Sequence, residues 1–277
     1  MSDNDQMSFL QHLEALRWHI IRSGIAIIVV AIAVFLNKSF VFDQVIFGPK
    51  SPDFPTFQFL CNFSHWLYGI LPQLVVSADV LCIGQGFPEL QNINMSGQFT
   101  THIMVSLIGG LVVGFPYVSW ELWRFIKPGL KASEQKSTRG IVFFTWILFS
   151  LGVVFGYFVI SPLSVNFFFN YSISDQVQTL PTLSTYISTV VTITVACGFV
   201  FELPVLVFFL TKAGLVTPEF LKKYRKHSVV AALILSAIIT PPDVFSQFLV
   251  TLPLMVLYEI SIVIARLVIK RENKALS

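Results

Sequence analysis

Glu202 is a single carboxylate within a long apolar stretch, and its chemistry stands out most in this sequence. It is the only charged side chain between Asp175 and Lys212. A carboxylate in the hydrocarbon core of a bilayer costs about 3 kcal/mol on insertion scales, so it normally faces the protein interior or a water-filled cavity. Three hydroxyl side chains fall on its side of a helix with a period of 3.6 residues: Ser184, Ser188 and Thr192. We therefore interpret Glu202 as lining a polar groove. The alternatives are a proton relay and a neutral acid held only by packing.

Two further carboxylates lie among basic residues, where they can bind a cation. Glu14 stands three residues before Arg17 in the segment 8–22, which has helical hydrophobic spacing. Glu134 lies in the segment 121–139 together with five Lys and Arg residues. A carboxylate that faces a pocket accepts two parallel hydrogen bonds from a guanidinium, whereas an exposed one is simply solvated. The residues alone leave both interpretations open.

The elements that must position these acids are membrane helices. Of the 277 residues, 55% are hydrophobic and 12% are charged, whereas soluble domains carry about 25% charged residues. The hydrophobic runs predict an all-α membrane protein of one domain, residues 1–277, with six transmembrane helices and a long outside segment at 43–97. The predicted spans are about 20–42, 98–120, 139–161, 184–211, 228–240 and 244–265. The uncharged parts of the last two are too short for a hydrocarbon core of about 30 Å, so we expect two short final spans.

Lys and Arg are segregated to alternate connections between the spans. All but Lys38 and Lys50 of the 18 basic residues lie in the N-terminal segment, in 121–139, in 212–227 or in the C-terminal segment. Cytoplasmic loops carry the excess of Lys and Arg. We therefore expect a multi-pass protein of the cell (inner) membrane with both termini in the cytoplasm.

Cys61 and Cys82 both fall in the outside segment 43–97. An oxidising compartment permits a disulfide, so we hypothesise a Cys61–Cys82 bridge, the alternative being two free buried thiols. A Cα separation well above about 7 Å would exclude the bridge. Cys197 lies in a span, where we expect it to be a small packing residue.

Several unrelated motifs, in order from the first span to the last, make the chain resemble the TatC family. TatC proteins are the central membrane subunit of the twin-arginine protein translocase. The matching stretches are HLEALR at 12–17, FP at 115–116, WRFIKPGL at 123–130, Glu134, SPL at 161–163, FVFELPV at 199–205 and TPPDVFSQ at 240–247. The segment 43–97 resembles the family least.

The resemblance implies a glove-shaped bundle that binds the twin-arginine signal peptides of folded cargo. It also implies TatA-like and TatB-like single-span partners and self-association in a receptor complex. Where the family has Glu directly before the Leu-Arg pair, this chain has Ala15, and Glu14 stands one residue earlier. Glu202 matches the acid that lines the family's concave groove. The implied signal-peptide-binding residues are Glu134, Glu14, Arg17 and Phe125, and the implied partner-helix contacts are Thr240, Asp243 and Gln247.

We expect a non-enzymatic translocase subunit without a cofactor or a metal. No Gly-x-x-x-x-Gly-Lys-Ser/Thr stretch for ATP binding occurs in the sequence. A proton-coupled secondary transporter that uses Glu202 is the alternative, with His102 as a second ionisable group. A membrane hydrolase is disfavoured because no His-Glu-x-x-His or Gly-x-Ser-x-Gly stretch occurs. The expected partners are lipid, signal peptides and single-span proteins, and not nucleic acid.

Overall fold

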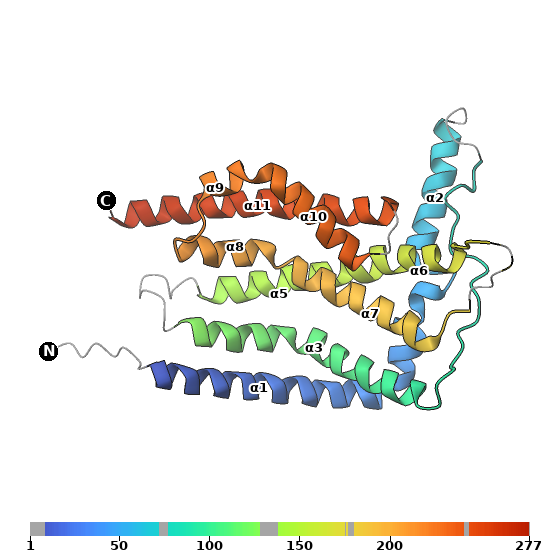
Figure 1. Cartoon of the computed structure of the whole chain (residues 1–277), viewed down its shortest axis with the longest axis horizontal. Helices are drawn as coiled ribbons and strands as arrows, with labels where there is room; N and C mark the ends of the chain where they lie inside the picture. Colours follow the sequence, from blue (N-terminus) through green and yellow to red (C-terminus); the bar gives the residue numbers. More distant parts are fainter. Residues whose placement is uncertain are drawn as a thin grey trace. The chain divides into compact units, whose positions relative to one another are not determined.

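The computed structural model describes residues 9–71, 77–127, 138–174, 176, 180–240 and 244–276. Within these residues the regular structure is helical, apart from an isolated β-bridge between Gln91 and Thr182. Figure 1 shows the helices α1 (Phe9–Leu36), α2 (Pro55–Ile70), α3 (Gly97–Ile126), α5 (Thr138–Phe155), α6 (Ser161–Asn170), α7 (Leu183–Val200), α8 (Leu203–Lys212), α9 (Pro218–Lys223), α10 (Arg225–Ile239) and α11 (Val244–Leu276). Short π or 3-10 turns are η1 (Phe40–Ile46), η2 (Gly48–Lys50) and η4 (Gly156–Ile160). The predicted all-α class is confirmed.

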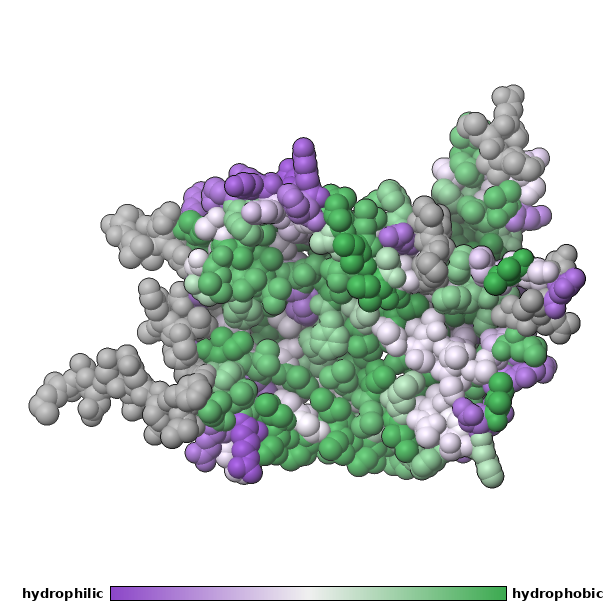
Figure 2. Space-filling model, viewed as in Figure 1, coloured by the Kyte–Doolittle hydropathy of each residue, from purple (hydrophilic) through white to green (hydrophobic). Residues whose placement is uncertain are grey.

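Most of the predicted spans correspond to long apolar helices. Among the described residues, five stretches are long and apolar enough to cross a membrane: Leu13–Leu36, Gly97–Ile126, Gly140–Asn170, Leu183–Lys212 and Ser246–Lys270. Helix α10 has 15 residues, which is about 22 Å of helix, so a sixth span stays a prediction. Hydrophobic side chains dominate the face in Figure 2, as lipid contact requires, and hydrophilic ones gather over α9 and the start of α10.

The last helix is longer than the sequence indicates. We expected a short final span at about 244–265, whose uncharged part ends before Glu259, but α11 runs unbroken for 33 residues. The Oε2 atom of Glu259 forms an ion pair with Nη2 of Arg225 at 2.7 Å. Because an acid paired with a cation on a neighbouring helix does not have to end an apolar helix, the expectation is corrected to one short helix, α10, followed by a long one.

The chain divides into two compact units, each of which is described by itself. The first comprises residues 1–37 and 102–147, and in it α1 packs closely on α3. A Cβ atom at Gly110 would lie 2.6 Å from the carbonyl oxygen of Ile27 and 2.9 Å from the Cβ of Ala31. Small residues at membrane helix interfaces let the backbones approach in this way, so Gly110 sets the α1–α3 distance.

The second unit comprises residues 38–101 and 148–277. Its main hydrophobic core is built from Ile160, Ile193, Cys197, Phe201, Ala232, Val250, Leu254 and Leu257. Cys197 is a free thiol and only 2% exposed, which is the packing role expected from the sequence. A Cβ atom at Gly152 would lie 2.5 Å from the carbonyl oxygen of Cys197, so α5 and α7 are in close contact here. The helix is interrupted between Val200 and Leu203, next to Pro204, as the missing N–H of proline favours.

The predicted outside segment 43–97 is partly helical and belongs to the second unit. It contains α2 and η2 and most of η1, and the hydroxyl of Tyr157 donates a hydrogen bond to the carbonyl of Val45 at 2.6 Å. Cys61 of α2 and Cys82 form a disulfide with their Cα atoms 4.2 Å apart. The alternative of two free thiols therefore does not apply to this structure.

Candidate functional site

A buried carboxylate, Glu121, is the centre of a polar cluster between α1 and α3. Its side chain is 1% exposed, and it lies in the last two turns of α3. The Oε2 atom is bonded to Nδ1 of His19 on α1. The Oε1 atom accepts from the hydroxyl of Tyr117 and from Nη1 of Arg124, each at 3.2 Å. Both oxygens thus have donors, as a buried carboxylate requires.

Aromatic rings surround this cluster. The ring of His19 meets the ring of Phe125 edge to face, with the centroids 6.1 Å apart. The guanidinium of Arg124 lies over the ring of Trp120, 4.8 Å from its centroid. His19 therefore bonds the buried acid and also contacts Phe125, for which the family resemblance implies a role in signal-peptide binding. A cation over an aromatic face is stabilised by about 0.5 to 1 kcal/mol at an exposed position.

The predicted site residues on α1 lie near this cluster but do not join it. Glu14 and Arg17 are both exposed, and the described ion pairs at this end of α1 involve Glu121 instead. Ala15 stands four residues before His19, so it shares the His19 face of the helix. Glu14, one residue earlier, is rotated by about 100° from that face. The other predicted acid, Glu134, lies outside the described residues.

Sequence reasoning missed both His19 and Glu121. Tyr117, Glu121 and Arg124 stand at i, i+4 and i+7, which places them on one helical face. This spacing was visible in the sequence and could have identified Glu121. Its contact with His19 joins residues 102 positions apart, and no local pattern indicates it.

Glu202 lies at the interruption between α7 and α8. Its carboxylate oxygens are buried, and no described group bonds them within hydrogen-bonding distance, although the backbone of Phe149 is near enough to interact with the carboxylate. Its main-chain carbonyl accepts from the N–H groups of Val205 and Leu206, each at 3.0 Å. No described hydrogen bond links Glu202 to the predicted stripe of hydroxyls on α7. The lining of a groove by Glu202 thus stays a prediction.

The two described partner-contact residues bond within the α10–α11 hairpin. The Thr240 hydroxyl donates to the carbonyl of Ser236 at 2.8 Å, and the Gln247 amide donates to the carbonyl of Leu233 at 3.1 Å. Hydroxyl groups of Ser236 and Thr251 are 2.9 Å apart. The Gln247 bond and the Ser236–Thr251 pair link α10 to α11, whereas the Thr240 bond lies within the end of α10. Asp243, the third predicted contact, lies outside the described residues.

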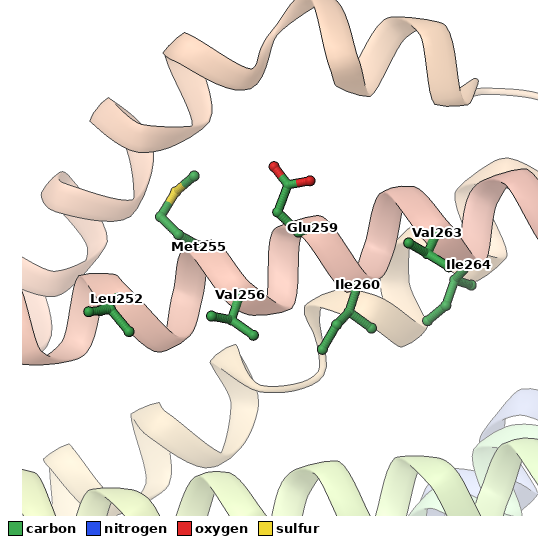
Figure 3. Close-up of a pocket in the computed structure, with 7 residues that line it drawn as sticks. All are labelled: Leu252, Met255, Val256, Glu259, Ile260, Val263 and Ile264. Atoms are coloured by element: carbon green, nitrogen blue, oxygen red, sulfur yellow. The ribbon is translucent and has the colours of Figure 1, made fainter.

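An open apolar hollow lies along α11, and Figure 3 shows the side chains that line it. It has a volume of about 540 Å³ and is lined by Leu252, Met255, Val256, Glu259, Ile260, Val263 and Ile264. Most of these side chains are aliphatic, and Glu259 is the single acid among them. The surface therefore suits a hydrophobic helix better than a polar ligand.

Comparison with known proteins identifies the family. Residues 11–253 match the family model "Sec-independent protein translocase protein (TatC)". A TatC protein of Blattabacterium sp. subsp. Periplaneta americana (strain BPLAN) is 37% identical over 271 residues, covering 98% of this chain and 99% of that protein. One of Carboxydothermus hydrogenoformans is 32% identical, covering 98% and 97%.

Solved structures agree with these sequence relatives. A crystal structure described as the twin arginine translocase receptor TatC is 30% identical, with a TM-score of 0.66, and covers 93% of this chain and 99% of that one. A second, obtained in DDM, is 29% identical with a TM-score of 0.67. The chain belongs to the TatC family and is a multi-pass membrane subunit of the Sec-independent, twin-arginine protein translocase.

Proposed function

We propose that this chain binds twin-arginine signal peptides at the end of α1 and α3 that carries Glu14, Arg17, His19 and Phe125, together with Glu134. The observation that carries the proposal is the Glu121–His19 contact, because it fixes the two helices that bear these residues. The side chains of Glu14 and Arg17 are exposed there. An incoming peptide can therefore reach them without opening the buried cluster.

The chemistry of recognition follows from the guanidinium group. A carboxylate accepts two parallel hydrogen bonds from an arginine, whereas a lysine ammonium cannot reproduce this planar fork. Glu134 and Glu14 supply the carboxylates, and the ring of Phe125 supplies an apolar contact for the peptide. Family membership gives no support to the alternative of a proton-coupled transporter, and His102 has a structural contact, since its ring stacks on Phe35 at 3.9 Å.

Crosslinking of a signal peptide tests this proposal. A twin-arginine peptide with a photoreactive group would be irradiated with membranes that contain the chain, alongside its twin-lysine variant. We expect Glu134→Ala to reduce the crosslinked fraction at least about tenfold, the loss of one charge-assisted hydrogen-bond pair. Glu219→Ala, at an exposed position on α9, is the matched control. Undiminished crosslinking in Glu134→Ala, or equal crosslinking of the twin-lysine peptide, would overturn the proposal.

We also propose that TatA-like and TatB-like single-span proteins dock on the hollow of α11, with both termini of this chain in the cytoplasm of a cell with an inner membrane. The apolar lining around Val256 supports a helical partner, since van der Waals packing drives helix association in bilayers. Self-association in a receptor complex belongs to the same proposal.

Cysteine crosslinking distinguishes the partner surface from other exposed positions. Val256→Cys should crosslink to a co-expressed single-span subunit that carries a cysteine in its helix. Phe99→Cys, on α3 and 62% exposed, should not. Equal crosslinking at the two positions would contradict docking on α11.

A further inference from the structure

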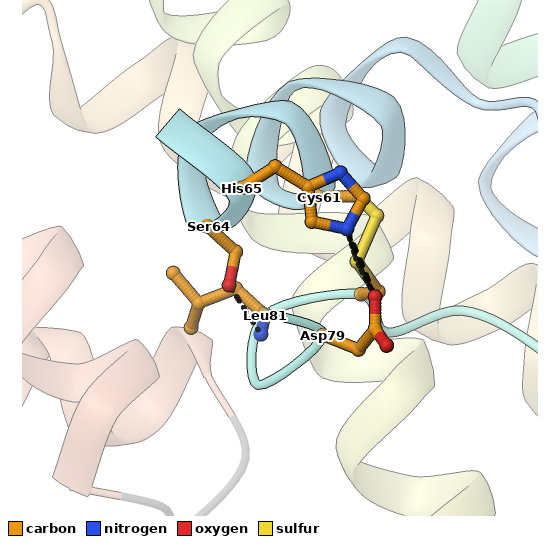
Figure 4. Close-up of polar contacts among 6 residues, drawn as sticks. Cys61, Ser64, His65, Asp79 and Leu81 are labelled. Carbon is orange, nitrogen blue, oxygen red and sulfur yellow. Dashed lines mark hydrogen bonds and ion pairs between the residues drawn. A yellow bond between two sulfur atoms is a disulfide. The ribbon is translucent and has the colours of Figure 1, made fainter. Parts of the chain in front are cut away.

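Four side chains with the chemistry of metal ligands meet in the predicted outside segment, and two of them, Cys61 and Cys82, form its disulfide. Cys61 and His65 lie on α2, and Asp79 and Cys82 lie on the loop that follows it. Figure 4 shows the His65 ring and the Asp79 carboxylate pointing toward one another next to the disulfide. Ligand atoms of Cys61, His65 and Cys82 all lie within 4.8 Å of one another.

The spacing of these residues pairs two ligands within each segment. Cys61 and His65 stand four residues apart on a helix, so they share a face. Asp79 and Cys82 stand three residues apart in a turn, in which the Cys82 N–H donates to the carbonyl of Asp79 at 3.0 Å. Each segment thus contributes two ligands, as zinc sites with paired ligands do.

The distances approach those of a tetrahedral site. Ligand atoms about 2.0 to 2.3 Å from a zinc ion are separated by roughly 3.3 to 3.8 Å. Here Nε2 of His65 is 3.8 Å from Sγ of Cys82, and Oδ1 of Asp79 is 3.7 Å from the same sulfur. The His65–Asp79 distance is 2.9 Å, so this pair and the two bonded sulfurs have to move apart to admit an ion.

We propose that Cys61, His65, Asp79 and Cys82 form a site for a thiophilic divalent cation such as Zn²⁺ once the disulfide is reduced. The same two segments are then cross-linked by a disulfide in one redox state and by a metal ion in the other. A dithiol gives two electrons and two protons to the disulfide, which yields two cysteine thiols and an oxidised dithiol. Binding of Zn²⁺ releases the two thiol protons to solvent, and two thiolates, an imidazole and a carboxylate hold the ion.

Other contacts keep the loop beside α2 when the disulfide opens. The N–H of Leu81 donates to Oγ of Ser64 at 3.4 Å (Figure 4). Gly84 has a φ of +90°, and a Cβ there would lie 2.5 Å from the ring of Phe57, so the backbone approaches α2 closely just after Cys82. Both cysteines line a cavity of about 330 Å³, and the side chains of His65 and Asp79 are 53% and 77% exposed. A reductant and a cation therefore have access.

Titration with Co²⁺, a spectroscopic probe for tetrahedral sites, tests the proposal. The full chain in detergent would be reduced with dithiothreitol, desalted without oxygen and titrated. We expect one equivalent of Co²⁺ to bind with thiolate charge-transfer absorption and with the visible bands of a tetrahedral ion, and Zn²⁺ to displace it. The unreduced protein and the Cys61→Ser/Cys82→Ser variant, which retains Cys197, should show neither absorption.

Two ligand variants keep both cysteines and so leave the disulfide able to form. His65→Ala and Asp79→Asn should each weaken Co²⁺ binding at least about tenfold, while His227→Ala, an exposed histidine on α10, should bind as the parent does. The proposal is overturned if the reduced parent takes up no more Co²⁺ than the double serine variant, or if His65→Ala binds as tightly as the parent. A loss of helical circular dichroism on reduction that Zn²⁺ does not restore would overturn it as well.

Discussion

The imidazole of His19 on α1 is bonded to the carboxylate of Glu121 on α3, although the two residues are 102 positions apart in the sequence. The side chains are 17% and 1% exposed. A buried carboxylate of this kind is tolerated only when donors satisfy both of its oxygens. The relative position of α1 and α3 therefore depends on the protonation and the hydrogen bonds of one carboxyl group, that of Glu121.

Replacing Glu121 tests the contribution of the cluster to stability. Glu121→Ala leaves three donors without their acceptor, so we expect a loss of about 3 kcal/mol in the free energy of unfolding. Glu121→Gln keeps one acceptor oxygen and should lose less. Thermal unfolding in detergent, followed by circular dichroism, measures both. Glu219→Ala on α9 should change stability by less than about 0.5 kcal/mol, and an Ala variant as stable as the parent would show that the cluster is not structural.

The sequence predicts the helices of this protein better than its polar cluster. Hydrophobic runs indicate five of the spans, because a helix needs only about 20 apolar residues to cross a bilayer. The length of α11 was missed because the partner of Glu259 is Arg225 on another helix. The contact of His19 with Glu121 was missed for the same reason, since only the fold brings the two residues together. The shift of Glu14 by one residue from the family's position was recognised from the sequence, but only the structure shows that its side chain is exposed.

Gly110 tests the close packing of α1 on α3. In Gly110→Ala the new methyl group would lie 2.6 Å from a backbone oxygen of Ile27, so the helices must separate, at an expected cost of about 1 to 3 kcal/mol. The same unfolding assay measures this loss. Gly24→Ala on α1 is the matched control, because a Cβ there meets no atom within 4 Å. It should leave stability unchanged or raise it by about 0.5 to 1 kcal/mol through helix propensity. Equal effects at the two glycines would contradict the packing argument.

Thr251 tests the polar bonds between α10 and α11. Thr251→Val keeps the volume of the side chain but removes the hydroxyl that lies 2.9 Å from Oγ of Ser236. We expect a loss of about 0.6 kcal/mol, the average for hydrogen bonds between membrane helices, and of at most about 1.7 kcal/mol. Thr192→Val, at an exposed position on α7, should have no effect in the same assay. A destabilisation of similar size at Thr192 would mean that replacing a hydroxyl by a methyl group, and not the loss of the bond to Ser236, is responsible.

Glu202 is the most informative position to replace. Its buried carboxylate predicts no loss of stability on replacement, whereas its proposed place in a groove predicts a loss of transport. Its carboxylate oxygens are buried and no described group bonds them, so Glu202→Gln removes a poorly solvated acid and should not lower the unfolding temperature. If the acid lines a working groove, as we propose, transport of a folded reporter with a twin-arginine signal should nevertheless fall. Glu89→Gln, in an exposed loop, should change neither quantity. Unchanged transport would reduce Glu202 to a packing residue, whereas a loss of more than about 1 kcal/mol in stability would reveal a hydrogen bond to its carboxylate.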